Sequence, residues 1–554
     1  MLGRQNQNSI ERRMVSATNR LPAVVWPGFY DDSHGECFLR CFYPNFSSKE
    51  PKLVQQSVSM HERRPGHVAL WDDQYTEKHH GRALSQSTTE PQPSPQRVLT
   101  LFDCICIIVG TIIGSGIFIL PGAIASNVPN IYWLAGVWVF GGVVALIGAL
   151  CFAELTTTYP DSGGDYGYLK RAYGRRVGFA FSWAAFWVIR PANIGAMAMA
   201  FGEFGAKTIP TSMPIWWYAV IAIIVMSVAN LMGVTFGKTV QNFLTVAKVL
   251  GMLLIVVAAF VFGSEQDPSL VAPLAAQGTE SPQSLWSGFW LAMVFVMFAF
   301  GGWNDIAFVA SEAKEPKRNL LRSLVLGTTV VVLVYLLVNF SLLYGLGFER
   351  MSTLGSQWGN ATSVLVAENI GSVGSRLFNI LVCISCLGAI NAMIFTSPRI
   401  YWATADDYPG LQWMAGSKEG RGWWRAMLLQ SIVTLVLIYV FGRIDDGVAN
   451  LVAASAPYFW FFLGIAVVSL MVCRVRFKGQ FGGYRIPLYP VLPLVFLAAC
   501  VFMIYRSLLY MHEQELAGPT IWIGIWVIAG ILLSFTLKSH IETDRPQKPI
   551  GDIS

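Results

Sequence analysis

Long apolar stretches recur along this chain from Leu99 onward, and they constrain its fold more than any other feature. Each stretch is close to the ~20 residues that a helix needs to cross a ~30 Å hydrocarbon layer. Lipid offers no hydrogen-bond partners to a bare backbone, so each stretch must be helical. Only 13% of the residues are charged, whereas a soluble domain carries about 25%. The sequence therefore predicts an all-α integral membrane protein.

We expect twelve membrane spans, and the distribution of basic residues supports this count. The approximate cores are 99–121, 131–156, 177–203, 214–236, 240–263, 285–311, 321–346, 376–398, 425–442, 449–473, 488–507 and 519–537. With the N-terminus inside, the outer loops hold about three basic residues, Lys207, Arg350 and Arg443. The inner loops hold many more, namely Lys170, Arg171, Arg175, Arg176, Lys238, Lys314, Lys317, Arg318, Arg399, Lys418, Arg421, Arg474, Arg476, Lys478, Arg485 and Lys538. This bias predicts a multi-pass protein of the plasma membrane with both termini in the cytoplasm.

Residues 1–98 differ in composition from the rest of the chain. They are polar, with a cluster at Glu62-Arg63-Arg64 and three prolines just before the first span. Such a segment buries too little apolar surface to fold alone, so we expect a disordered cytoplasmic tail. A translation start at Met60 is an alternative, and a peptide from residues 1–50 in mass spectrometry of the mature protein would contradict it. Residues 538–554 are expected to form a second, C-terminal cytoplasmic tail.

The reactive residues of the chain form no recognisable catalytic or metal motif. Its seven histidines, at 34, 61, 67, 79, 80, 512 and 540, lie in the tails or in an outer loop. Its nine cysteines include no CxxC pair with a matching partner, and the spans contain no HExxH or GxSxG. The basic residues lie in short loops, which is not typical of nucleic-acid binding. We therefore expect no enzyme activity, no cofactor, no metal and no nucleic-acid partner, and the lack of a short re-entrant segment disfavours a channel.

Spans one and six each carry small residues near the middle of a long apolar stretch. Span one reads VGTIIGSGIF at 109–118, and span six reads FAFGGWND at 298–305. A glycine costs about 1 kcal/mol in a helix interior, so clustered glycines make local unwinding cheap. The alternative is that Gly110 and Gly114 form a GxxxG packing motif and that Gly301-Gly302 is a plain kink. Their matching positions, five spans apart, favour a binding site.

An unwound helix inside the membrane is tolerated where its backbone lines a cavity, and there the freed groups can bind a ligand. The half-helix beyond Ser115-Gly116 offers amide groups and a positive dipole end, which suit a carboxylate. Freed carbonyls such as that of Ile112 suit an ammonium group. An α-amino acid carries both charges on one carbon, so we expect an amino acid substrate. The pattern also predicts two inverted five-span repeats, 99–263 and 264–473, with spans 11 and 12 appended at 474–537.

A series of ordered motifs makes the chain similar to a known family. VGTIIGSGIF resembles the first-span signature of the L-type amino acid transporter family, of the bacterial type, within the amino acid–polyamine–organocation superfamily. The other similar segments are Ala153-Glu154-Leu155, Tyr159-Pro160, SGGDY at 162–166, Ile189-Arg190-Pro191, FAFGGWN at 298–304, Pro398-Arg399-Ile400 and IPLYP at 486–490. The resemblance implies the architecture of the bacterial leucine transporter, with five plus five inverted helices and two more.

The resemblance also implies roles for individual residues. The expected substrate-binding set is Ile112, Ile113, Gly114, Ser115, Gly116, Phe298, Ala299 and Gly301. In this set the backbone at Ser115 and Gly116 would hold the substrate carboxylate, and carbonyls at 112, 298, 299 and 301 would hold the amino group. The Phe298 ring would act as a gate on the extracellular side. Trp303 and Asn304 would support the unwound part of span six.

Lys248 is the most informative charge within a span. It lies about 12 Å deep along span five at 1.5 Å per residue, so its ammonium group either snorkels to the surface or has a function. The family has a lysine at this place, and the resemblance implies that Lys248 stands in for a sodium ion and ties span five to the break. A role in coupling, by releasing a proton during the cycle, is the alternative.

Three other charges have simpler interpretations. Arg190 would bond to carbonyls freed by Pro191 or take part in transport. Asp305 would cap the second half of span six. Glu154 would be a hydrated carboxylate near the inner end of span two.

The expected function is transport of amino acids by alternating access, with neutral substrates favoured because no charge clearly faces a substrate side chain. The transporter would be a sodium-independent exchanger or a proton-linked symporter, with protons as a second partner. An amino acid sensor, or a transporter of polyamines or other organocations, is the alternative.

Members that pair with a glycoprotein heavy chain carry a cysteine between spans three and four, whereas this chain has Ser212 at that place. We therefore predict that no disulfide-linked heavy chain accompanies the protein. Affinity purification followed by gels with and without reductant checks this. A stoichiometric second subunit that separates only on reduction would overturn the prediction.

Overall fold

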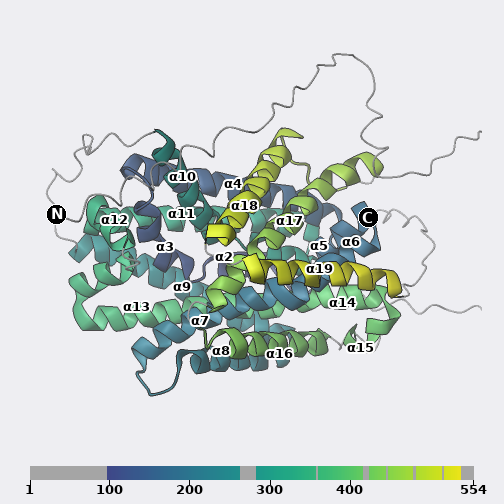
Figure 1. The fold of residues 1–554 in the computed structure, drawn as a ribbon, viewed down its shortest axis with the longest axis horizontal. Helices are drawn as coiled ribbons and strands as arrows, with labels where there is room; N and C mark the ends of the chain where they lie inside the picture. Colours follow the sequence, from purple (N-terminus) through teal and green to yellow (C-terminus); the bar gives the residue numbers. More distant parts are fainter. Residues whose placement is uncertain are drawn as a thin grey trace, which may run out of the picture. The chain divides into compact units, whose positions relative to one another are not determined.

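The computed structural model describes residues 97–161, 163–262, 282–356, 360–415, 423–444, 447–477, 482–513 and 517–537. The expected tails at 1–98 and 538–554 lie outside these residues, apart from Arg97 and Val98. The regular secondary structure of the described part is helical, and its one extended contact is an isolated bridge between Leu99 and Ala313. Figure 1 shows the helices in chain order.

The helices of the first half, before residue 282, run from α2 to α9. They are α2 (Leu101–Ile112), α3 (Gly116–Ala125), α4 (Ile131–Thr158), α5 (Asp165–Tyr173), α6 (Arg175–Ala184), the π-helical η1 (Ala185–Ile189), α7 (Arg190–Thr208), α8 (Ile215–Leu231) and α9 (Val234–Phe262).

The second half carries the remaining helices. They are α10 (Pro282–Ala299), the 3₁₀-helical η3 (Trp303–Glu312), α11 (Pro316–Leu346), α12 (Phe348–Ser356), α13 (Ala361–Thr396), α14 (Pro398–Asp407), η4 (Pro409–Leu411), α15 (Gln412–Ala415), α16 (Trp423–Phe441), α17 (Gly447–Arg476), α18 (Val491–Glu513) and α19 (Ala517–Thr536).

Nine helical segments of the described chain are long and apolar enough to cross a membrane, and the bent pair α2–α3 makes a tenth. Two shorter apolar helices, Ile215–Leu231 and Ile521–Thr536, overlap the fourth and twelfth predicted spans. Each predicted span therefore contains an apolar helix. The count of twelve crossings and the inverted repeat stay predictions, because Ile215–Leu231 and the apolar part of the last helix, Ile521–Thr536, each have fewer than 18 residues.

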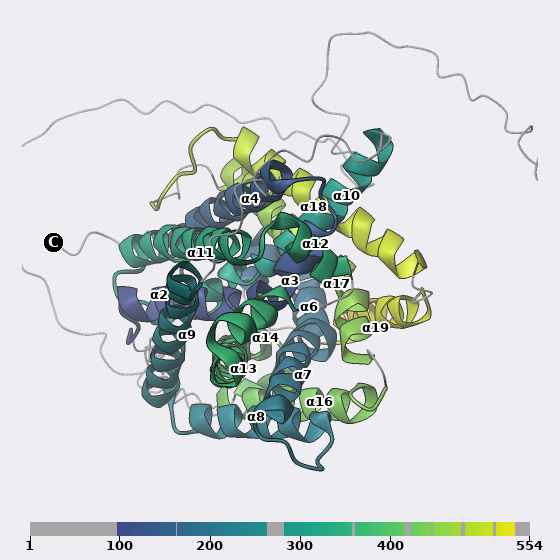
Figure 2. The same ribbon diagram turned by 90° about the vertical axis from the view of Figure 1, so that its left-hand side faces the viewer.

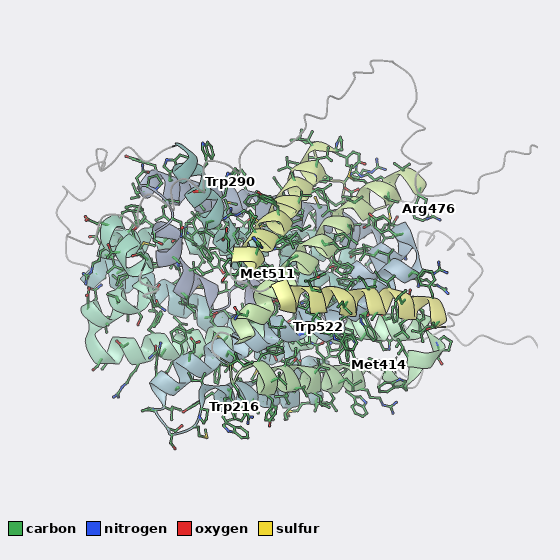
Figure 3. All side chains as sticks on the ribbon, in the orientation of Figure 1. Trp216, Trp290, Met414, Arg476, Met511 and Trp522 are labelled. Atoms are coloured by element: carbon green, nitrogen blue, oxygen red, sulfur yellow. The ribbon has the colours of Figure 1, made fainter. Side chains whose placement is uncertain are left out.

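The helices pack around the segment that contains the first break. Figure 2 shows α3 near the middle, with α4, α11, α9, α8, α16 and α19 around it. α11 packs along α4, and α13 packs against both α7 and α9. In Figure 3 Arg476, at the end of α17, lies toward the right-hand end, whereas Trp216 and Trp290 lie toward the left. The right-hand end is the one that the basic residues predict to be cytoplasmic.

The structure interrupts both glycine-rich spans. α2 ends at Ile112, α3 begins at Gly116, and the two axes differ by 46°. α10 ends at Ala299, and η3 begins after Gly302, which has the left-handed φ of 109°. A Cβ at Gly302 would lie 2.9 Å from Cγ2 of Thr111. Only glycine suits this backbone angle and this close approach between the two breaks.

The alternative of a GxxxG packing seam is wrong in its simple form. A Cβ at Gly110 would lie 1.8 Å from Nε2 of Gln241 on α9, whereas one at Gly114 would lie 2.7 Å from Sδ of Met197 on α7. The two glycines do permit close packing, but against different helices. Their spacing therefore does not define one helix–helix interface.

Glu154 is not the hydrated carboxylate that its position near a span end suggests. The side chain is fully buried at the end of α4, and Oε1 accepts a hydrogen bond of 2.6 Å from Nε of Arg474. Its Oε2 accepts a second bond of 2.8 Å from the backbone amide of Ile486. The carboxylate thus joins α4 to the end of α17 and to the loop before α18. This contact could not be read from the sequence because its partners lie more than 300 residues away.

Candidate functional site

A cavity of about 130 Å³ lies between the two helix breaks. It is lined by Thr111, Ile112, Gly114, Gly116, Arg190, Asn193, Met197, Met297, Phe298, Ala299, Gly301, Gly302, Asn304, Asp305, Ala389, Met393, Val452, Ser455, Ala456, Phe459 and Trp460. Pockets for drug-sized ligands measure about 300–1,000 Å³. The volume therefore suits a small ligand, and the lining brings together both breaks with α7, α13 and α17.

The first break presents the start of α3 to the cavity. Gly116 is the first residue of α3 and lines the cavity with Gly114. Amide groups in the first turn of a helix have no acceptor within that helix, and the helix dipole adds positive potential there. Ser115 and Ile113 are not among the lining residues, and the Ser115 hydroxyl contacts Sδ of Met197 at 3.9 Å. Their assignment to the substrate-binding set stays a prediction.

Lys248 joins α9 to the first break from behind the cavity. Its Nζ donates hydrogen bonds of 3.0 Å to the Gly110 carbonyl, 2.7 Å to the Ile113 carbonyl and 3.0 Å to the Ser385 carbonyl. The side chain is 0% exposed, so the snorkelling alternative is wrong. Three carbonyl acceptors match the three donors of an ammonium group. The predicted role of Lys248 in coupling remains to be tested.

Tyr335 of α11 joins the two breaks, and the sequence reasoning missed it. Its hydroxyl lies 3.2 Å from the carbonyl oxygen of Ile112 and 3.2 Å from that of Ala299. These are two of the carbonyls expected to hold the substrate amino group, so the structure brings them together. Tyr335 is fully buried. A phenol in an apolar span needs a hydrogen-bond partner, and on this ground Tyr335 could have been singled out from the sequence.

The remaining predicted residues of span six divide into a lining group and a supporting one. Phe298, Ala299 and Gly301 line the cavity. Phe298 is 46% exposed, and its carbonyl accepts a 3.1 Å bond from the Gly301 amide, whereas its role as a gate stays a prediction. Trp303 does not line the cavity. It is buried against Phe152, with ring centroids 5.2 Å apart.

Arg190 and Asp305 form a buried ion pair in the cavity wall. The guanidinium donates two hydrogen bonds of 2.7 Å to the two carboxylate oxygens. The interpretation of Asp305 as a helix cap is therefore wrong, because η3 has no side-chain cap and its carboxylate binds Arg190. Arg190 bonds to this carboxylate rather than to carbonyls freed by Pro191. It follows the π-helical turn η1, and its guanidinium also stacks over the Phe308 ring at 4.6 Å.

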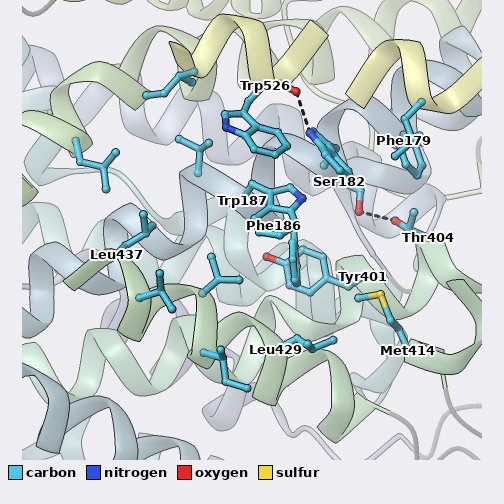
Figure 4. Close-up of a pocket in the computed structure, with 18 of the residues that line it drawn as sticks. Phe179, Ser182, Phe186, Trp187, Tyr401, Thr404, Met414, Leu429, Leu437 and Trp526 are labelled. Carbon is cyan, nitrogen blue, oxygen red and sulfur yellow. Dashed lines mark hydrogen bonds between the residues drawn. The ribbon is translucent and has the colours of Figure 1, made fainter. Parts of the chain in front are cut away.

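A second cavity, of about 1170 Å³, lies away from the breaks among α6, η1, α14, α16, α17 and α19 (Figure 4). Indole and aliphatic side chains make up most of its wall, including Trp187, Trp526 and Leu437. Its hydrogen bonds join wall residues to one another, as between the Thr404 and Ser182 hydroxyls at 2.7 Å. A zwitterion would find no charged group among its lining residues. The cavity between the breaks is therefore the better candidate for an amino acid site.

The sequence matches a protein family and is similar to known amino acid transporters. The family model described as Amino acid permease matches residues 99–533. The chain belongs to this family. It is 28% identical to the serine/threonine exchanger SteT of Bacillus subtilis (strain 168), over 80% of this chain and 98% of that protein. It is also 28% identical to the human b(0,+)-type amino acid transporter 1, over 84% of this chain and 92% of the relative.

A third relative is named for other amino acids than the first. The human cystine/glutamate transporter is 28% identical over 77% of this chain and 84% of its own length. The three names describe transport or exchange of amino acids, and none describes an enzyme. The permease is therefore a multi-pass membrane protein whose relatives transport amino acids.

The contact between the two breaks predicts a specific sensitivity. Gly302→Ala places a methyl group 2.9 Å from Thr111 on a backbone with a φ of 109°. We expect the substitution to lower the free energy of unfolding by about 1–3 kcal/mol and to reduce substrate uptake at least several-fold. Thermal unfolding in detergent and uptake into proteoliposomes measure the two effects. Gly136→Ala on α4 is the matched control, because a Cβ there meets nothing within 4 Å. Equal behaviour of the two variants would contradict the prediction.

Proposed function

We propose that this permease carries small neutral α-amino acids across the plasma membrane by alternating access. The observation that supports the proposal is the pair of helix breaks, whose residues line one cavity of about 130 Å³ together with the first residue of α3. In this proposal, the backbone amides at Ser115 and Gly116 bind the substrate carboxylate, next to Gly114. Carbonyls at 112, 298, 299 and 301 bind the amino group, as the family resemblance implies, and Ile113 belongs to the same backbone segment.

The preference for neutral side chains rests on the charges in the cavity wall. Arg190 and Asp305 are the charged residues among its lining residues, and they satisfy each other in a two-bond ion pair. The part of the wall beyond the breaks is largely apolar, with Met197, Met393 and Trp460. A charged substrate side chain would lose its hydration there without gaining a partner. A small apolar or hydroxylated side chain loses little.

The proposed transport mode is sodium-independent. Lys248 places a buried positive charge against the carbonyls of the first break, where a bound sodium ion would be repelled. Exchange is supported by the name of the Bacillus relative, a serine/threonine exchanger. Coupling to protons is the second mode that the chain's buried ionisable groups allow. The Phe298 ring would close the site on the extracellular side, with Trp303 and Asn304 supporting span six. Cytoplasmic termini and operation without a heavy chain complete the proposal.

Uptake into proteoliposomes tests the function. A labelled mixture of neutral amino acids is added outside, with and without unlabelled amino acids inside, and with and without an inward proton gradient. Uptake that needs internal substrate means exchange, and uptake into vesicles without internal substrate that rises with the gradient means proton symport. We expect saturable uptake in at least one condition. Its absence in all of them, with protein that is folded and inserted, would reject transport of neutral amino acids.

A further inference from the structure

A buried carboxyl lies directly behind the wall of the cavity. Asp165 is the first residue of α5, which connects the second and third spans, and it is 3% exposed. Its side chain is hydrogen-bonded to Asn304, and Asn304 lines the cavity. The Oδ1 atom of Asp165 has no hydrogen-bond partner among the described residues. The Asn304 side chain thus lies between the Asp165 carboxyl, whose Oδ1 has no partner, and the cavity proposed for the substrate.

The segment that carries Asp165 is pressed against the second half of span six. A Cβ at Gly164 would lie 2.7 Å from the backbone carbonyl carbon of Ala307, so the two backbones touch. The Gly163 amide donates a 3.4 Å bond to the Phe308 carbonyl. η3 is a 3₁₀ helix of ten residues, whereas 3₁₀ runs longer than three or four residues are uncommon. Movement of η3 would therefore change the surroundings of Asp165 at once.

The charges around Asp165 do not balance when it is ionised. Arg190 of α7 and Asp305 of η3 face it and pair with each other, so an ionised Asp165 leaves the buried cluster with one excess negative charge. The phenols of Tyr168 and Tyr401 lie near the cluster and have no hydrogen-bond partner among the described residues. An unpaired charge in such a place is costly, and a bound proton removes it.

The other ionisable groups near α5 interact with residues other than Asp165. Asp407 of α14 binds Tyr166 and Lys170. On α17, Arg474 pairs with Glu154, and Cys473 lies near Tyr159. The ionisable neighbours of Asp165 are therefore Arg190, Asp305 and Tyr168, with Tyr401 behind them.

Burial and the neighbouring charges together favour the protonated form of Asp165 near neutral pH. Burial is the largest cause and raises the pKa of Asp165 to about 7 from its ordinary 3.8. The positive charge of Arg190 and the bond from Asn304 lower this pKa, whereas the negative charge of Asp305 raises it. Hydration of the cluster would remove the largest cause, so the pKa would fall and the proton would leave to water.

Lys248 is a poorer proton carrier for a geometric reason. A neutral amine has two N–H donors, so loss of its proton would leave one of three buried carbonyls without a partner. Asp165 has the opposite arrangement, since a proton on Oδ1 removes an excess charge and breaks no hydrogen bond.

We propose that Asp165 is the binding site of a co-transported proton, which reaches it from the cavity and leaves when η3 separates from α5 toward the predicted cytoplasmic side. The proton comes from water and returns to water, and no other bond changes. The inference rests on the proposed function, because it couples this proton to amino acid transport. It predicts that a proton moves with the substrate and that Asp165 is needed for this movement but not for exchange.

The test uses proteoliposomes that contain a pH-sensitive dye, with the labelled neutral amino acid mixture as the probe. For the wild-type protein we expect internal acidification during uptake into vesicles without internal substrate. A single carboxyl with a pKa of about 7 loses its proton as pH rises, so this uptake should fall about tenfold from external pH 6 to pH 8. Asp165→Asn mimics the protonated form. It should retain exchange within a few-fold of wild type but lose both acidification and pH dependence.

Asp161→Asn is the matched control, because Asp161 lies four residues earlier and is an exposed carboxylate paired with Arg171. It should behave as wild type. Exchange by the wild-type protein without acidification would overturn the proton site and leave the proposed function standing. Acidification that persists in Asp165→Asn would overturn it as well. No transport by the wild-type protein would overturn both proposals.

A second variant covers the case in which Asp165→Asn does not fold. Asp165→Glu keeps the carboxyl but moves it by one methylene relative to Arg190 and Asp305, so the pH midpoint of uptake should shift. An unchanged midpoint in this variant would overturn the proposal.

Discussion

Backbone groups that a helix break releases inside a membrane must find partners within the protein, and this requirement organises the centre of the permease. The carbonyls around the first break receive donors from three different helices. Lys248 of α9, Tyr335 of α11 and the Ser385 hydroxyl of α13 bond to carbonyls between residues 110 and 114. The break is thus fixed from three sides. The amides at the start of α3 are the groups that the proposed function leaves for a substrate.

Charge inside the bundle follows the same rule, since buried charges are stable where they are paired. Arg190 pairs with Asp305 across α7 and η3, and Glu154 pairs with Arg474 across α4 and α17. Both pairs connect segments far apart in the chain, so they specify the packing as well as neutralise charge. Asp165 has no cation of its own, because Arg190 is already engaged. This difference singles it out among the buried carboxylates described here.

The features that the sequence predicted are those carried by local composition. Apolar runs marked the spans, glycine clusters marked both breaks, and an isolated lysine marked Lys248. Partners chosen by packing were not predictable. The Tyr335 hydroxyl meets the Ile112 carbonyl across 223 positions of sequence, and Arg190 meets Asp305 across 115. The 3₁₀ form of η3 and the π turn of η1 were not predicted either.

The second cavity, which α19 lines, affects how the protein is stabilised in a membrane. α19 contacts α6 more than any other helix, and the Trp183 indole donates a 2.9 Å bond to the Trp526 carbonyl at that contact. The second cavity measures about 1170 Å³ and has a largely apolar wall. An apolar wall offers water few hydrogen-bond partners, so in a bilayer the acyl chains of lipids are the solvent that suits this space. The indoles of the wall would then be stabilised by contact with lipid as well as with one another.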